Sequence, residues 1–186
     1  MLKTINTITK TLSIDSNVTV LSYKDFILIT GKKGRIVYKL DRRKNKTKLI
    51  LKKNSLDLIL EKDKENHTEK FFSEKITKLF NGVNNHHYVK LNLTGIGFRS
   101  WVYFDSNQNQ ILIVKIDLSK DLKFIIPRSV TVFCLTPTLI FIRGIQKDDV
   151  KSLALKIKQT RKVDNYKGKG IFFEGETKRL KAGKKI

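Results

Sequence analysis

The chain has 186 residues, and its 39 lysines and arginines against 17 aspartates and glutamates give a formal net charge of +22 at pH 7. A polyanionic partner offsets self-repulsion of this size, so nucleic acid or an acidic membrane surface is expected as partner before any small-molecule substrate. Hydrophobic residues make up 40% of the chain, which excludes a fully disordered basic tail and is enough for one large or two small cores.

Residues 1–13 contain lysine but no arginine or acid, and they are interpreted as an ordinary basic N-terminal extension rather than an organelle presequence. The longest apolar runs are far shorter than the roughly 20 residues of a membrane helix, so no transmembrane span is expected. The single cysteine, Cys134, excludes an intramolecular disulfide and every multi-cysteine zinc site. Because Cys134 lies in an apolar strand-like segment, it is predicted to be a buried, inert thiol.

Residues 14–85 are predicted to form a first small α+β repeat. Its strand-like segments are Val18–Val20, Phe26–Gly31, Lys33–Tyr38, Leu49–Leu51 and Leu56–Leu60. The intervening Gly31-Lys32-Lys33-Gly34 matches a loop that clamps RNA backbones between two helices, but its strand-like flanks favour a hairpin turn with two exposed lysines. One helical face then carries Phe72, Ile76, Leu79, Phe80 and Val83, and this helix is predicted to end at Asn81-Gly82.

Residues 86–175 are predicted to form a second repeat with the same classes of element. Strand-like segments occur at Val89–Leu93, Trp101–Phe104, Ile111–Ile116, Val130–Val132 and Leu139–Gly144. A helix follows, with Val150, Leu153, Ala154 and Ile157 along one face. Asp148 and Asp149 at its start are expected to offset the helix dipole rather than to act as a catalytic pair.

The segments Val18–Gly31 and Val130–Gly144 share motif and spacing to within one residue. This similarity predicts an internal duplication in which the two segments occupy equivalent strands, with a boundary near Asn84–His87. The alternative is coincidence between two ordinary β-hairpins. The predicted fold class is therefore α+β, with two duplicated small domains, each an antiparallel sheet packed with one helix, plus a basic C-terminal tail at residues 176–186.

No set of residues assembles into a catalytic or metal site. His67, His86 and His87 lack the cysteine or spaced carboxylate that completes a metal site, so solvated turns are expected there. No nucleophile, base and oxyanion site can be combined from the sequence, which predicts that the protein is not an enzyme and uses no cofactor.

The C-terminal stretch, residues 151–186, carries 12 basic and 3 acidic residues, a net charge of +9. Its Lys167-Gly168-Lys169-Gly170 motif fits two interpretations: a loop whose bare amides and ammonium groups approach phosphates, or a flexible basic linker. This stretch is the strongest candidate for a binding surface.

Three segments together resemble a known family. Leu93-Thr94-Gly95-Ile96-Gly97-Phe98-Arg99, the Pro127 turn with Val130–Gly144 after it, and Tyr166-Lys167-Gly168-Lys169-Gly170-Ile171 are similar to the universal family of large ribosomal subunit protein six, in its bacterial type. The similarity is ordered from about Val83 to Lys185. It is weaker before that, where Ile29–Gly34 resembles the first repeat of the family.

This resemblance implies a non-catalytic role in the large ribosomal subunit. It implies binding of large-subunit rRNA around the sarcin-ricin loop and near the stalk base, where translation factors dock, and contact with neighbouring ribosomal proteins. Matched positions carried over as RNA-facing are Gly97, Arg99, Tyr166, Lys167, Gly168, Lys169 and Gly170. The basic composition of the same region adds Arg161, Lys162, Lys178, Arg179, Lys181, Lys184 and Lys185.

The sequence also departs from the family pattern. Val163-Asp164-Asn165 stands where the family usually has prolines, and Phe172 stands where it usually has arginine. Residues 41–70 follow the pattern poorly and are interpreted as an expanded, lineage-specific loop. Such drift, with a composition typical of AT-rich coding sequence, favours a mitochondrial ribosome over a bacterial or plastid one.

Two function hypotheses remain at this point. The first is a structural rRNA-binding protein that has no membrane or small-molecule partner. The alternative is a transient RNA-binding module or ribosome assembly factor, which predicts that Tyr166, Phe172 and Phe173 stack on single-stranded bases.

Overall fold

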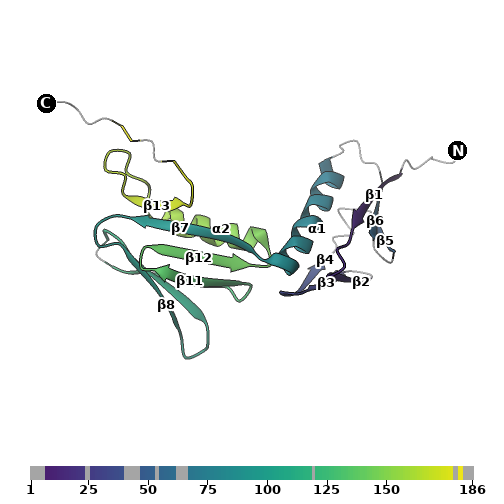
Figure 1. Ribbon diagram of the computed structural model, residues 1–186, viewed down its shortest axis with the longest axis horizontal. Coiled ribbons are helices and arrows are strands. Elements are labelled where there is room, and N and C mark those ends of the chain that lie inside the picture. Colours follow the sequence, from purple (N-terminus) through teal and green to yellow (C-terminus); the bar gives the residue numbers. More distant parts are fainter. Residues whose placement is uncertain are drawn as a thin grey trace. The chain divides into compact units, whose positions relative to one another are not determined.

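The computed structural model describes residues 7–23, 26–39, 47–52, 55–61, 67–118, 120–177 and 180–181. The chain divides into two compact units, residues 1–86 and 87–186. Both combine antiparallel sheets with one helix, so the fold class is α+β with duplicated small domains, as the sequence predicts (Figure 1). Among the described residues, no helix is both long and apolar enough to cross a membrane.

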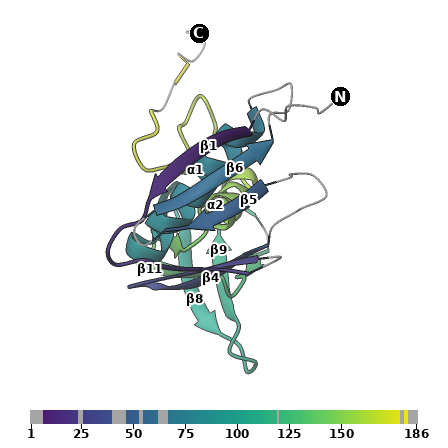
Figure 2. The same cartoon turned by 90° about the vertical axis from the view of Figure 1, so that its right-hand side faces the viewer.

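The first unit contains six strands followed by a helix. The strands are β1 (Thr7–Ser13), β2 (Thr19–Ser22), β3 (Phe26–Gly31), β4 (Gly34–Lys39), β5 (Thr47–Leu51) and β6 (Ser55–Glu61), and the helix is α1 (His67–Asn85). One three-stranded sheet has the order β2-β3-β4. The other has the order β1-β6-β5, and Figure 2 shows β6 between its two neighbours.

Helix α1 forms because its apolar residues recur on one face. Phe72, Ile76, Leu79, Phe80 and Val83 are all buried, which confirms the predicted helix and its inner face. The predicted end at Asn81-Gly82 is wrong, because the helix continues to Asn85 and His86 then leaves it with a positive φ of 47°. Gly82 is buried within the last turns, where burial of its neighbours outweighs the low helix propensity of glycine.

The turn between β3 and β4 packs against the end of α1. The Lys33 backbone N–H donates to the Val83 carbonyl at 2.8 Å, and a Cβ on Gly31 would come within 2.9 Å of Val83. The Gly31–Gly34 segment is therefore a two-residue hairpin turn, as predicted, and its first glycine is required by close packing on the helix rather than by a ligand.

The second unit contains six strands, a helix and one further strand. The strands are β7 (His87–Thr94), β8 (Arg99–Phe104), β9 (Gln110–Lys115), β10 (Leu122–Ile125), β11 (Val130–Thr136) and β12 (Leu139–Gly144), followed by α2 (Lys147–Gln159) and β13 (Gly170–Phe173). They form a three-stranded sheet, β10-β9-β8, and a four-stranded sheet, β11-β12-β7-β13. A single core of alternate strand residues and the apolar face of α2 lies between them, and Leu91, Ile140 and Ile157 are fully buried in it.

The two units repeat one topology. Six strands precede the helix in each, and the orders β1-β6-β5 and β2-β3-β4 of the first unit correspond to β7-β12-β11 and β8-β9-β10 of the second. In both units the second strand also lies beside the fifth, as β2 beside β5 and β8 beside β11. Strand β13 is the addition in the second unit, on the free edge of β7.

This topology corrects the predicted alignment of the repeats. Val18–Gly31 covers β2 and β3, whereas Val130–Gly144 covers β11 and β12, so the two segments occupy different positions in their repeats. The counterpart of β11 and β12 is the hairpin of β5 and β6, which lies within the segment 41–70 that was interpreted as an expanded loop. Residues 41–46, 53–54 and 62–66 of that segment lie outside the described residues.

The predicted N-terminal extension is also part of the fold. Residues 7–13 form β1, which pairs with β6 from Thr7 opposite Glu61 to Ser13 opposite Ser55. The first repeat therefore begins within residues 1–13 rather than after them.

Candidate nucleic-acid interface

The stretch that follows α2 returns to the sheet as a strand. Thr160 closes the helix, because its hydroxyl donates to the Ile157 carbonyl at 2.6 Å. After nine intervening residues β13 pairs with β7, placing Gly170 opposite Thr94 and Ile171 opposite Leu93. Ile171 has no exposed surface, so residues 161–169 form a loop held at both ends by the core of the second unit.

This loop, defined here as the 161–169 loop, closes on itself through Asp164. The Asp164 backbone N–H donates to the Lys169 carbonyl, and the Asp164 carbonyl accepts from the Gly168 N–H, both at 2.9 Å. The Asp164 carboxylate accepts from the Tyr166 N–H at 2.9 Å. That hydrogen bond is the main reason why the pKa of Asp164 lies below its ordinary value, with smaller contributions from nearby Lys167 and Arg161.

The two glycines of the motif are explained by the fold of the loop. Both are buried, and both have positive φ angles, 64° at Gly168 and 148° at Gly170. A Cβ on Gly170 would lie 3.0 Å from the Cα of Val163. The sequence leaves two interpretations of these glycines, close approach to phosphates or a flexible linker; at Gly170 the structure adds a close approach to the Val163 backbone.

The cations of the loop differ in what they contact. Arg161 and Lys169 both reach the Asp117 carboxylate, at 3.9 Å and 3.8 Å, so one negative charge is shared between two positive ones. Lys162 and Lys167 are exposed, and no carboxylate among the described residues lies within ion-pair distance of either. Tyr166 is 63% exposed. The loop therefore presents unneutralised positive charge and an aromatic ring to solvent.

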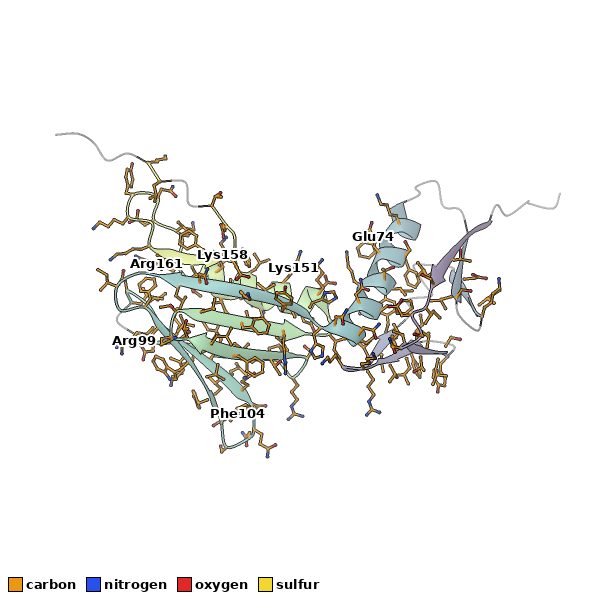
Figure 3. All side chains as sticks on the ribbon, viewed as in Figure 1. Glu74, Arg99, Phe104, Lys151, Lys158 and Arg161 are labelled. Atoms are coloured by element: carbon orange, nitrogen blue, oxygen red, sulfur yellow. The ribbon has the colours of Figure 1, made fainter. Side chains whose placement is uncertain are left out.

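Gly97 and Arg99 lie at the same end of the unit as the 161–169 loop. Gly97 belongs to the turn after Thr94, which is the residue paired with Gly170, and Figure 3 shows Arg99 and Arg161 at one end of the ribbon. Gly97 has a φ of 78°, and a Cβ there would meet nothing within 4 Å. Arg99 pairs across the strands with Lys115, and both are exposed. Like charges in opposed positions are unfavourable unless an anion binds them.

Acidic residues pair with cations at the other end of β13. Lys90 lies 2.9 Å from Glu174. Lys158 lies 2.6 Å from Glu176 and sits over the Phe173 ring at 4.6 Å from its centroid. The hydrogen bond from Lys158 is also the main reason why the pKa of Glu176 is lowered. Glu174 and Glu176 thus neutralise cations outside the 161–169 loop, while the two loop cations Arg161 and Lys169 share Asp117.

The remaining basic positions of the prediction are only partly described. Lys181 is exposed, and its backbone N–H donates to the Asn165 carbonyl at 2.9 Å, which ties this residue to the 161–169 loop. Lys178, Arg179, Lys184 and Lys185 lie outside the described residues.

The aromatic platform predicted by the alternative hypothesis is not formed as a set. Phe172 is only 3% exposed and Phe173 is half-buried against the core, so neither ring offers a face to a base. The sequence analysis did not identify β13, although three apolar residues directly after Gly170 are a strand signal. Tyr166 alone of the three rings is exposed.

The other candidate residues have structural explanations. Cys134 is half-buried rather than fully buried, and desolvation raises the pKa of its thiol, which keeps it protonated and unreactive. Asp148 and Asp149 lie in the first turn of α2, where their charge stabilises the helix dipole. The imidazole Nε2 of His86 lies 3.2 Å from the Lys33 carbonyl, next to the packed hairpin turn.

Comparison with known proteins gives one consistent result. The family model described as Ribosomal protein L6 matches residues 107–173, which span β9 to β13 and include the whole 161–169 loop. The chain is 28% identical to large ribosomal subunit protein uL6 of Alkaliphilus oremlandii over 163 residues, 87% of each chain. It is also 28% identical to the uL6 protein of Listeria monocytogenes, over 94% of this chain and 95% of that protein. For the uL6 protein of Rhodopirellula baltica the identity is 27%, over 94% of each chain.

Proposed function

Because this chain belongs to the ribosomal protein L6 family, we propose that it is a structural constituent of the large ribosomal subunit and binds large-subunit rRNA. Its contact region is the end of the second unit that carries the 161–169 loop. The rRNA site is the region of the sarcin-ricin loop and the stalk base, so the protein supports the site where translation factors dock. Neighbouring ribosomal proteins are its other partners.

The distribution of charge is the observation that carries this proposal. Exposed Lys162 and Lys167 flank an exposed tyrosine on a loop whose backbone is fixed by hydrogen bonds. A loop whose backbone is already fixed loses little further backbone freedom when its cations meet phosphates. Arg99 and Lys115 add a second pair of cations at the same end, and a net charge of +22 favours a polyanion over an acidic peptide.

The proposal is tested by the salt dependence of binding to a cognate rRNA fragment. Replacing both Lys162 and Lys167 with alanine should weaken binding and flatten the slope of log K against log salt by about two units, one per lost phosphate contact. The charge-matched control is the double variant Arg128→Ala/Lys151→Ala. Both residues are exposed, Arg128 lies just before the start of β11, and Lys151 lies near the start of α2, whereas the 161–169 loop follows the end of α2.

The control should leave the slope for the cognate fragment closer to that of the unchanged protein. If both double variants flatten the salt slope equally, binding depends only on the net charge of the protein, and the assignment to the 161–169 loop is wrong. Retention on purified large subunits through a high-salt wash separates a ribosomal constituent from the alternative, a transient assembly factor, which should dissociate.

We also assign the protein to a mitochondrial ribosome. The support is compositional. Lysine far outnumbers arginine, and both asparagine and isoleucine are abundant, which is typical of AT-rich coding sequence. Fractionation of the source cells tests this directly, because a chain that co-purifies with cytosolic or plastid ribosomes contradicts the assignment.

A further inference from the structure

The four-stranded sheet of the second unit has one face covered by α2 and one face open. Figure 1 shows α2 behind the sheet formed by β11, β12 and β7. Alternate strand residues such as Leu91 and Ile142 point to the α2 side and are fully buried. The residues between them point the other way, and several of these are large and exposed.

Three strands contribute two rows of side chains to this open face. In the first row Thr131 pairs with Arg143, and Arg143 pairs with Tyr88. In the second row the cross-strand partners are Phe133, Phe141 and Lys90. The exposed part of this face ends at β13, where Phe172 pairs with Asn92 and is buried. The two rows across β11, β12 and β7 are defined here as the open sheet face.

The aromatic rings of the open sheet face are partly stacked and still partly exposed. Tyr88 and Phe141 stack with centroids 5.6 Å apart and planes inclined by 23°. Tyr88 is nevertheless 62% exposed, so this stack has room for a further planar group at its outer ring. Phe133 is 40% exposed and lies beneath the Arg143 guanidinium, whose Cζ is 4.8 Å from the ring centroid.

Arg143 is held in place without being neutralised. Its Nε donates to the Thr131 hydroxyl at 3.2 Å, which leaves the terminal guanidinium nitrogens as donors directed away from that contact. No carboxylate within the described ranges of the chain forms an ion pair with it. Lys90 differs, because Glu174 neutralises it. The open sheet face therefore offers one positioned positive charge beside its rings.

From this arrangement we infer that the open sheet face binds an unpaired RNA segment, with one base stacked on Tyr88, another on the Arg143–Phe133 pair, and a phosphate held by the terminal nitrogens of Arg143. Planar rings on a sheet suit bases, because every base presents a π-face to them. An acidic protein partner would use the cation, but it would gain nothing particular from stacked rings. This interface goes beyond the proposed rRNA contact, since Tyr88 is near the start of β7 and the 161–169 loop lies by its end.

The test uses the full chain and two probes, a labelled 12-nucleotide oligouridine and a 12-base-pair RNA duplex. Tyr88→Leu and Phe133→Leu keep an apolar side chain of fair size but remove the ring. Each should weaken oligouridine binding by roughly 5- to 150-fold, the range found for single base–ring stacks. Neither should change binding of the duplex, whose bases are not free to stack.

The matched control is Phe104→Leu, because Phe104 is 70% exposed on β8, in the other sheet of the same unit. This control should leave oligouridine binding unchanged. The double variant Lys162→Ala/Lys167→Ala should weaken both probes, so failure of the loop assignment is distinguishable from failure of this inference. Thermal unfolding curves confirm that each variant is folded.

Ultraviolet crosslinking of the assembled particle supplies the second measurement. Peptides that contain Tyr88 or Phe133 should carry a nucleotide adduct. Oligouridine binding that is unaffected by both leucine variants overturns the inference. Crosslinks from these peptides to a protein instead of RNA overturn it as well, and they would identify the open sheet face as a protein-docking surface.

Discussion

Comparing Gly170 with Gly97 tests why glycine is required at positions near the 161–169 loop. Both have positive φ angles, 148° and 78°. A Cβ on Gly170 would lie 3.0 Å from the Val163 Cα and 3.3 Å from its Cγ2, whereas a Cβ on Gly97 would meet nothing. Gly170→Ala therefore adds a steric conflict to an unfavourable backbone angle, while Gly97→Ala adds the backbone angle alone.

The expected costs follow from these geometries. Gly97→Ala should destabilise the second unit by about 1 kcal/mol, the usual cost of a left-handed backbone for an L-residue. Gly170→Ala should cost about 3 kcal/mol, because its φ is nearly restricted to glycine and the Val163 backbone must also move. The difference of about 2 kcal/mol corresponds to a melting temperature lower by roughly 10 °C for a unit of this size.

Urea unfolding followed by tryptophan fluorescence measures the difference. The chain has one tryptophan, Trp101, and it lies on β8, so its emission reports on the second unit within the full chain. Equal costs for the two variants would refute the argument that the approach to Val163 requires Gly170. If Gly170→Ala also unfolds like the unchanged protein but loses rRNA binding, close approach of RNA is the reason for the glycine.

Two further predictions concern the charges of the 161–169 loop. Asp117→Asn releases Arg161 and Lys169 from their shared carboxylate, so the salt slope for the rRNA fragment should steepen by about one unit and affinity should rise; weaker binding would mean instead that the ion pairs position the loop. Asp164 has a lowered pKa, so its contribution to loop stability is complete above its ordinary pKa of 3.8 and is lost as the pH falls toward the lower value of the folded state. Amide hydrogen exchange at Tyr166 should therefore lose protection only below about pH 4 once intrinsic exchange is subtracted, and loss of protection near neutral pH would contradict this.

Local patterns in the sequence were enough to predict both helices and most hairpins. The spacing of Phe72, Ile76 and Val83 fixes the inner face of α1 without reference to the rest of the chain. The same holds for Val150, Leu153 and Ile157 in α2. Periodicity is a property of neighbouring residues, so one sequence contains it in full.

Pairing between distant strands is not contained in such patterns, and this is where the predictions failed. Val18–Gly31 and Val130–Gly144 both read as hairpins that end in glycine, yet Gly31 packs on Val83 and Gly144 packs near Ser129 and Val150. Similar motifs thus serve different contacts. The role of Asp117 was missed for this reason, since its partner Lys169 lies about 50 residues away along the chain. For β13 the local strand signal is present, but its pairing with β7, about 80 residues away, is not contained in it.

The four residues of the Lys167-Gly168-Lys169-Gly170 motif have different roles, so each has to be considered separately before the motif is assigned a function. Gly168 and Gly170 satisfy the backbone of the loop, and Lys169 shares a carboxylate with Arg161. Lys167 is the member whose charge is exposed and unneutralised among the described residues. Substitutions of the glycines should therefore weaken rRNA binding by disordering the loop, with a salt slope that changes less than affinity does. Substitution of Lys167 should change affinity and slope together, because released counterions account for both. The ratio of the two effects, measured for each position, separates residues that shape the interface from residues that touch phosphate.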